Sequence, residues 1–212
     1  MKKAKSKKRG RFIVIDGPDG AGKTTHAKML ADELTGRGIP VKNLREPGGT
    51  ALGEAIRGLV LDHGKTKIGT LAETFLFEAA RAQLIGEVIR PALDNGEWIV
   101  CDRFALSTLV YQGYAGGIRK KAVKQLSATA IGGLKPDAYF VLWVPAEIGA
   151  KRRADRPADR IESKGEAYLS SVFKGFHKEA KRHSDKYTLI DGRGAIQSVR
   201  KKIWKKIESL LK

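Results

Sequence analysis

Short apolar runs alternate with longer amphipathic stretches along most of this chain. Five runs of five or six residues, most of them rich in apolar residues, are predicted as strands: residues 12–16, 41–45, 98–102, 139–144 and 187–191. Helical spacing of apolar positions predicts helices over residues 23–34, 53–61, 70–93 and 199–211. Strands that alternate with helices predict βαβ units. The expected fold is α/β, a five-stranded parallel sheet flanked by helices.

The segment that follows the first predicted strand carries the clearest chemical signal. Residues 17–24 match G-x-x-x-x-G-K-[ST] without a mismatch, between a predicted strand and a predicted helix. Its glycines let backbone N–H groups turn toward phosphates, and the helix start adds its positive dipole end. The motif predicts binding of a nucleoside triphosphate with Mg²⁺ by Gly17, Asp19, Gly20, Ala21, Gly22, Lys23, Thr24 and Thr25. Lys23 suits the β- and γ-phosphates, and the Thr24 hydroxyl suits the metal.

The charge of the chain is strongly basic and only partly terminal. The 212 residues carry a formal charge of +18, and residues 1–11 hold seven Lys or Arg without an acid. Residues 1–10 are predicted to form a disordered basic arm, and residues 11–212 a single domain. A basic surface attracts polyanions, so weak polyanion binding through the arm is one interpretation. A merely solvating arm is the other.

Cysteine content and hydropathy exclude several classes of protein. Cys101 is the only cysteine, which excludes an intramolecular disulfide and a cysteine-rich metal site. It lies within an apolar run and is predicted to be a small buried side chain. No run approaches the ~18 apolar residues of a membrane span, and no apolar leader opens the chain. A cytoplasmic protein with no membrane contact is expected.

Three further segments resemble one family of phosphate-loop enzymes. GTPases read guanine with Asn-Lys-x-Asp, which this sequence lacks. Residues 100–112 contain a strand that ends in Asp-Arg-Phe and continues through Ser-x-x-x-Tyr-Gln, which resembles the thymidylate kinase signature. Residues 45–57 (Arg-Glu-Pro-Gly-Gly-Thr, then Glu-x-x-Arg) and residues 77–83 (Phe-x-x-x-Arg-x-Gln) resemble the same family. The resemblance covers nearly all of the chain except the basic arm.

The resemblance implies a fold, a reaction and partners. It implies the P-loop NTPase fold with a helical lid at about residues 150–165, and an enzyme of nucleotide biosynthesis. The implied reaction is ATP-dependent phosphorylation of dTMP to dTDP by direct in-line transfer, with Mg²⁺ as cofactor and dTTP synthesis as its purpose. A homodimer is implied as well.

An acceptor site for dTMP is expected from particular side chains. Phe77 and Arg81 lie four residues apart and so project from one helix face. By resemblance, Phe77 stacks on the thymine and Arg81 bonds its ring carbonyl. Arginine forks pair with phosphate oxygens, and the resemblance assigns the acceptor phosphate to Arg57 and Arg103. The remaining expected acceptor residues are Glu46, Thr108, Tyr111 and Gln112.

The expected catalytic residues come from the phosphate loop, the Asp-Arg segment and the lid. They are Lys23, Asp19, Arg103 and Arg156. Asp102 either orients Arg103 or holds Mg²⁺ through water beside Thr24. Gly20 follows Asp19, which resembles the subgroup that supplies its arginine from the lid. Arg153, Arg156 and Arg160 are all candidates for the γ-phosphate, and Arg153 could instead cover the adenine of ATP.

Two rival interpretations remain at the level of sequence. A kinase of another acceptor, such as dUMP or a deoxynucleoside, would share the phosphate loop. Arg57 and Arg103 together argue against a nucleoside, because a nucleoside has no phosphate for both to bind. A nucleic-acid-binding phosphate-loop protein would fit the basic composition and would lack kinase activity.

Overall fold

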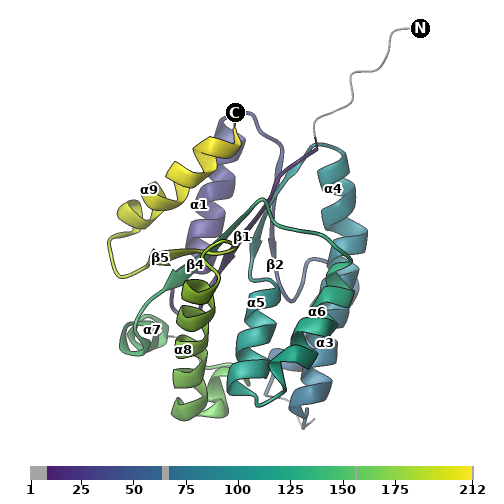
Figure 1. Ribbon diagram of the computed structural model, residues 1–212, viewed down its shortest axis with the longest axis vertical. Helices are drawn as coiled ribbons and strands as arrows, with labels where there is room; N and C mark the ends of the chain where they lie inside the picture. Colours follow the sequence, from purple (N-terminus) through teal and green to yellow (C-terminus); the bar gives the residue numbers. More distant parts are fainter. Residues whose placement is uncertain (1–8, 64–66, 156, 212) are drawn as a thin grey trace, which may run out of the picture.

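The computed structural model describes residues 9–63, 67–155 and 157–211. Its centre is a five-stranded sheet in the order β2-β3-β1-β4-β5, and every neighbouring pair is parallel (Figure 1). The strands are β1 (Phe12–Asp16), β2 (Val41–Arg45), β3 (Trp98–Asp102), β4 (Ala138–Trp143) and β5 (Thr188–Asp191). The predicted five-stranded parallel α/β fold is confirmed, and the strand bounds differ from prediction by one residue at most.

Helices surround this sheet. They are α1 (Lys23–Gly36), α2 (Ala51–Leu61), α3 (Thr70–Leu84), α4 (Arg90–Asp94), α5 (Ala105–Thr108), α6 (Lys120–Ile131), α7 (Ala146–Arg153), α8 (Glu166–Arg182) and α9 (Ile196–Ile207). Two π-helical segments are η1 (Ile85–Ile89) between α3 and α4 and η2 (Leu109–Ala115) after α5. Two 3-10 turns are η3 (Glu162–Lys164) before α8 and η4 (Glu208–Leu210) after α9. The helix predicted over residues 70–93 is thus observed as three consecutive helical segments, α3, the π-helical η1 and α4. Helices α5, α6 and α8 were not predicted, while the helical lid expected at about residues 150–165 overlaps the end of α7 and contains η3.

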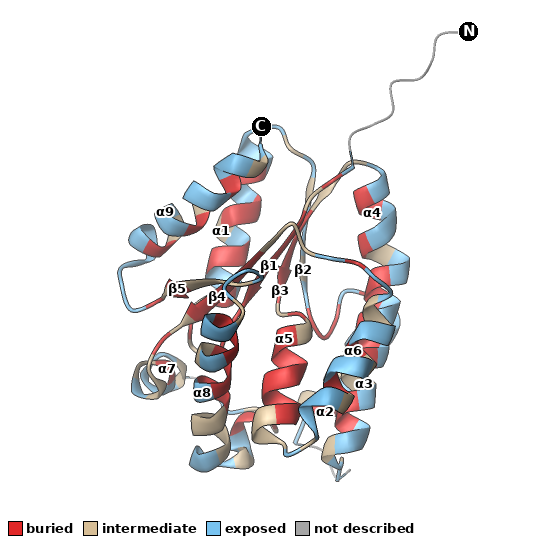
Figure 2. Cartoon of the chain, viewed as in Figure 1, coloured by how far each residue is buried: buried red, intermediate tan, exposed pale blue. Residues whose placement is uncertain are grey.

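Both faces of the sheet are covered, which explains the continuous apolar runs of its central strands β1, β3 and β4. Along β1, Phe12 and Val14 pack into one hydrophobic cluster, with side chains from α3 to α6 and α8. Ile13 and Ile15 pack into the other cluster, with α1 and α9. Figure 2 shows buried positions concentrated on the central strands and on the helix faces turned toward them. The predicted burial of Cys101 is confirmed, and burial raises the pKa of its thiol well above the usual value.

The order of the strands decides where polar residues gather. β1 lies between β3 and β4, and Ile15 pairs with Asp102 of β3. The phosphate loop leaves β1 beside the point where Asp102 and Arg103 leave β3. Crevices at the carboxyl ends of parallel strands are the usual ligand sites of such sheets.

The ends of the described chain add two observations. Residues 1–8 of the predicted arm lie outside the described residues, while the N–H of Gly10 donates to the carbonyl of Leu93 at 2.8 Å. Arg11 pairs with Asp137 at 2.8 Å. Among the described helices, none has the length and apolar character needed to cross a membrane.

Candidate active site

A cavity of about 530 Å³ opens at the carboxyl ends of β1 and β3. Most residues expected from the sequence line it: Asp19, Gly20, Gly22, Lys23, Thr24, Thr25, Glu46, Arg57, Phe77, Arg81, Asp102, Arg103, Thr108, Tyr111, Gln112 and Arg153. Gly17 and Ala21 belong to the same loop but do not line the cavity. Arg156 lies outside the described residues.

The phosphate loop has the backbone that its glycines predict. Gly17, Gly20 and Gly22 have positive φ angles of 143°, 80° and 91°, which favour glycine. Lys23 begins α1, and its ammonium lies 2.9 Å from the Pro18 carbonyl and 3.6 Å from the Asp19 carboxylate. Burial and the nearby Arg103 lower the pKa of Lys23. A buried cation at this place is ready to meet phosphate oxygens.

Sequence reasoning missed Asp16, the last residue of β1. Its fully buried carboxylate accepts hydrogen bonds from the N–H groups of Gly17, Phe104 and Ser107 at 2.8–3.2 Å, and from the hydroxyls of Ser107 and Tyr139 at 2.7 Å. These donors come from the phosphate loop, the start of α5 and β4. An acid at the end of a buried strand was the available signal.

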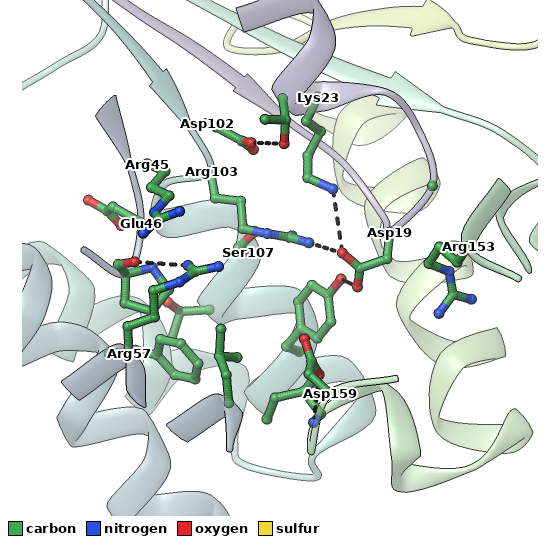
Figure 3. A pocket seen from close by; sticks show the side chains of 18 of the residues that line it. Asp19, Lys23, Arg45, Glu46, Arg57, Asp102, Arg103, Ser107, Arg153 and Asp159 are labelled. Atoms are coloured by element: carbon green, nitrogen blue, oxygen red, sulfur yellow. Dashed lines mark hydrogen bonds and ion pairs between the residues drawn. The ribbon is translucent and has the colours of Figure 1, made fainter. Parts of the chain in front are cut away.

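Asp19 lies between two cations and a phenol. Figure 3 shows its carboxylate facing Arg103 and Lys23, and the Tyr111 hydroxyl donates to it at 2.5 Å. Burial alone raises the pKa of Asp19, but Arg103 and Lys23 outweigh burial and hold it well below its usual range. Asp19 is therefore ionised, an acceptor of hydrogen bonds only.

Arg103 reaches the phosphate loop because the backbone turns sharply after β3. Arg103 is the one described residue other than glycine with a positive φ angle, 73°. Its N–H donates to the Ile15 carbonyl at 3.0 Å, and its guanidinium donates to the Gly17 carbonyl at 3.2 Å and to the Ser107 hydroxyl at 3.1 Å. These hydrogen bonds hold the Arg103 guanidinium in one orientation in the lining of the cavity.

Thr24 and Asp102 form the place that suits a metal. The Thr24 hydroxyl donates to Asp102 Oδ2 at 2.5 Å, while the buried Oδ1 has no partner among the described residues. No cluster of three or more His, Cys, Asp or Glu side chains in the described part of the chain could hold a metal by itself. Mg²⁺ that arrives on phosphates needs only one or two protein oxygens. Of the two roles expected for Asp102, this arrangement favours metal binding.

The opposite wall of the cavity is built on α3. The Arg81 guanidinium pairs with Glu46 and with Glu78, each at 2.7 Å, and donates to the Thr108 hydroxyl at 3.1 Å. Phe77 lies half-buried one turn before Arg81. Burial raises the pKa of Glu46 to about 7 despite the neighbouring Arg81, because two buried carboxylates share that single guanidinium.

Arg57 lies on the same side of the cavity, on α2. Its guanidinium donates to the Pro47 carbonyl at 3.0 Å, and Figure 3 shows it near Arg45 and Glu46. Arg45 lines the cavity too, although the sequence did not mark it as a site residue. Together with Arg81 and Arg103, four arginines therefore border this half of the cavity.

The lid approaches the phosphate loop through two glycines. A Cβ atom at Gly20 would lie 2.4 Å from the Gly149 carbonyl oxygen, so no side chain fits there. Arg153, at the end of α7, lines the cavity and pairs with Glu162 at 3.4 Å. The guanidinium of Arg152, which was not expected from the sequence, donates a hydrogen bond to the Gly192 carbonyl at 3.1 Å. Arg160 does not line the cavity and pairs with Glu73 instead.

Replacing Asp16 by alanine should destabilise the protein strongly, because it strips several buried donors of their common acceptor. We expect the free energy of unfolding, measured in urea, to fall by about 3 kcal/mol or more. Asp16→Asn keeps the shape and one acceptor oxygen, and should lose less. A loss below about 1 kcal/mol for Asp16→Ala would contradict the role of this carboxylate.

The raised pKa of Glu46 should make stability depend on pH. Its pKa is about 7 when folded, against 4.5 for the free side chain, so the folded state holds this proton more tightly. That stabilisation is complete below pH 4.5 and disappears as pH rises through 7. The free energy of unfolding of the wild type relative to Glu46→Gln should fall between about pH 5 and pH 7 and then level off. Urea unfolding at several pH values measures this, and a constant difference would contradict it.

Comparisons with known proteins identify one family. A family model described as thymidylate kinase matches residues 15–203. The thymidylate kinase of Exiguobacterium sibiricum is 37% identical over 204 residues, 96% of each chain. That of Prochlorococcus marinus strain NATL1A is 42% identical over 206 residues, 94% of this chain and 98% of the relative. A crystal structure of thymidylate kinase from Ehrlichia chaffeensis matches with a TM-score of 0.77 at 30% identity, covering 94% of this chain and 99% of that one. The predicted resemblance is confirmed: this chain belongs to the thymidylate kinase family.

Proposed function

We propose that this chain transfers the γ-phosphoryl group of ATP to dTMP, giving dTDP and ADP for dTTP synthesis. The observation that carries the proposal is the cavity itself. On one side it has a phosphate loop with Lys23, and on the other it has Arg57, Arg103 and the Phe77–Arg81 wall. Two phosphate-binding halves in a single cavity suit a donor triphosphate and an acceptor monophosphate.

The phosphate loop and α1 form the donor half. Backbone N–H groups of the loop and the Lys23 ammonium bind the β- and γ-phosphates. The Thr24 hydroxyl and, through water, Asp102 would hold Mg²⁺, whose charge neutralises phosphate oxygens of ATP. Arg153 and Arg156 are the lid arginines proposed to act on the transferring group or to cover the adenine. Arg160 is already held by Glu73, so we no longer propose it for the γ-phosphate.

The acceptor half orients the attacking oxygen. Arg57 and Arg103 hold the dTMP phosphate, Phe77 stacks on the base, and Arg81 with Thr108 faces its carbonyl. Ionised Asp19 accepts a hydrogen bond from the sugar hydroxyl, while Tyr111 fixes that carboxylate. Glu46 orients Arg81, and Gln112 completes the base site.

Positioning and charge account for the chemistry. A phosphate oxygen of dTMP attacks the γ-phosphorus in line as the bond to the β–γ bridging oxygen breaks, so no covalent enzyme intermediate forms. A phosphate acceptor needs no strong general base. Fixed guanidinium and ammonium groups meet the negative charge of the transferring group without reorganisation.

An ADP-release assay with ATP and Mg²⁺ tests the reaction on dTMP, dUMP, CMP and thymidine. We expect turnover to be highest on dTMP and minimal on thymidine, because Arg57 and Arg103 need a phosphate. Arg103→Ala should lower kcat/KM for dTMP roughly 100-fold and leave ATP binding nearly unchanged. Arg37→Ala, an exposed arginine stacked on Trp204, is the control. Turnover on thymidine equal to that on dTMP would refute the acceptor assignment.

We further propose that the protein is a homodimer that uses α2 and α3. These neighbouring helices expose four large apolar side chains, each 48–55% exposed: Leu52, Leu59, Leu71 and Phe75. Exposed apolar residues at helical spacing on adjacent helices indicate a contact surface.

Introducing charge on this surface should weaken the dimer. Phe75→Glu is expected to shift the mass measured by light scattering toward one 23.2 kDa chain. Ile196→Glu alters an equally exposed apolar residue on α9 and should leave the mass unchanged. A wild type with the mass of a single chain would refute the proposed dimer.

Two expectations accompany this proposal. The family to which the chain belongs leads us to expect a cytoplasmic enzyme. The basic residues 1–11 would add weak, salt-sensitive polyanion binding to the kinase activity.

A further inference from the structure

Glu73 on α3 is a buried carboxylate that the proposed reaction does not use. Its side chain is 0% exposed, and it lies outside the cavity lining. An ionised carboxylate is costly to bury unless it is paired and hydrogen-bonded. Its partners therefore indicate what Glu73 does, and they come from two places: the lid and the acceptor site.

On one side, Glu73 holds the lid. Lys164 lies 2.9 Å from both carboxylate oxygens, and the Arg160 guanidinium pairs with Oε2. The same guanidinium donates to the Val60 carbonyl at 2.8 Å, and the Arg160 N–H donates to the Leu61 carbonyl at 3.0 Å. Residues 160–164 are thereby fastened to the end of α2 and to α3.

These contacts place lid residues over the cavity. Asp159 and Ile161, on either side of Arg160, both line it. The Ala158 carbonyl lies 2.7 Å from a ring nitrogen of His63. The side chains of Arg160 and Lys164 are 17% and 24% exposed in the paired state. If their pairs with Glu73 break, both can therefore turn to water. The lid would then lose its main attachment to α3.

On the other side, Glu73 fixes the amide of Gln112. Gln112 Nε2 donates to Glu73 Oε1 at 2.9 Å, and Gln112 lines the cavity. A carboxylate only accepts hydrogen bonds, so the NH₂ end of the amide must face Glu73. The amide carbonyl is left to accept a hydrogen bond, and thymine offers its ring N–H where cytosine offers only an unprotonated ring nitrogen.

We propose that Glu73 is a positioning residue: one buried carboxylate fastens the lid over the cavity and also sets the orientation of the Gln112 amide toward the acceptor base. This inference rests on the proposed function, because it gives Glu73 a role in dTMP phosphorylation. It couples lid closure to base recognition, since both depend on the same two oxygens.

Glu73→Gln tests the proposal because it keeps the size of the side chain and removes its charge. Hydrogen–deuterium exchange of residues 158–164 should become faster, and kcat on dTMP should fall by about 10- to 100-fold. A glutamine can accept or donate, so the Gln112 amide is free to flip. The ratio of kcat/KM for dTMP over dCMP should therefore fall as well.

Glu179→Gln is the matched control. Glu179 is also buried, at 2% exposure, and binds the Tyr114 hydroxyl at 2.6 Å and Lys124 at 3.7 Å, away from the cavity. Its loss should lower stability without changing lid exchange or the base ratio. Arg160→Met should also speed lid exchange, and its effect combined with Glu73→Gln should be smaller than the product of the single effects.

The outcomes distinguish the proposed role of Glu73 from the proposed phosphorylation of dTMP. Unchanged lid exchange in Glu73→Gln, or faster exchange with an unchanged dTMP-to-dCMP ratio, would overturn the coupling. If Glu73→Gln does not fold, Arg160→Met and Lys164→Met carry the exchange test, and normal exchange in both would overturn it. Wild-type protein that does not turn over dTMP would refute the proposed function, whereas the exchange measurement needs no acceptor and judges the lid attachment by itself.

Discussion

The carboxylate of Asp16 is the interaction on which the site depends. It is fully buried, and its five hydrogen bonds join segments that are far apart in sequence. A buried charge persists only when its oxygens are satisfied. The phosphate loop, the turn after β3 and the side chain of Tyr139 therefore cannot move independently. Because Asp16 binds both the phosphate loop and the segment that follows Arg103, it fixes the positions of Lys23 and Arg103 relative to each other.

Around that anchor the site balances charges that are close together. Asp19 lies between Arg103 and Lys23, and the Arg81 guanidinium pairs with both Glu46 and Glu78. These pairs hold the cations in place before any nucleotide enters. Because little rearrangement is then needed, the groups that meet the phosphates are preorganised.

Sequence patterns predicted the central strands β1, β3 and β4 because both of their faces are covered, which leaves continuous apolar runs. Helix α6 was missed because Val123 is its only buried large apolar residue. The helical spacing of Val172, Phe176 and Ala180 in α8 was present but overlooked beside the basic lid. The phosphate loop and the Asp102-Arg103 segment lie close together because β1 and β3 are neighbours in the sheet. The acid that ends the first strand was visible in the sequence, but the hydrogen bonds of Asp16 and the pairing of Glu73 with Arg160 depend on tertiary contacts that no local pattern encodes.

The left-handed backbone at Arg103 has an evolutionary consequence. A non-glycine residue in this conformation costs of order 1–3 kcal/mol, whereas glycine or asparagine adopts it more easily. Selection for thermal stability alone would thus favour losing the arginine, while selection for nucleotide turnover would retain it. Position 103 is thus a place where backbone stability and nucleotide turnover make opposite demands, and this chain carries the arginine.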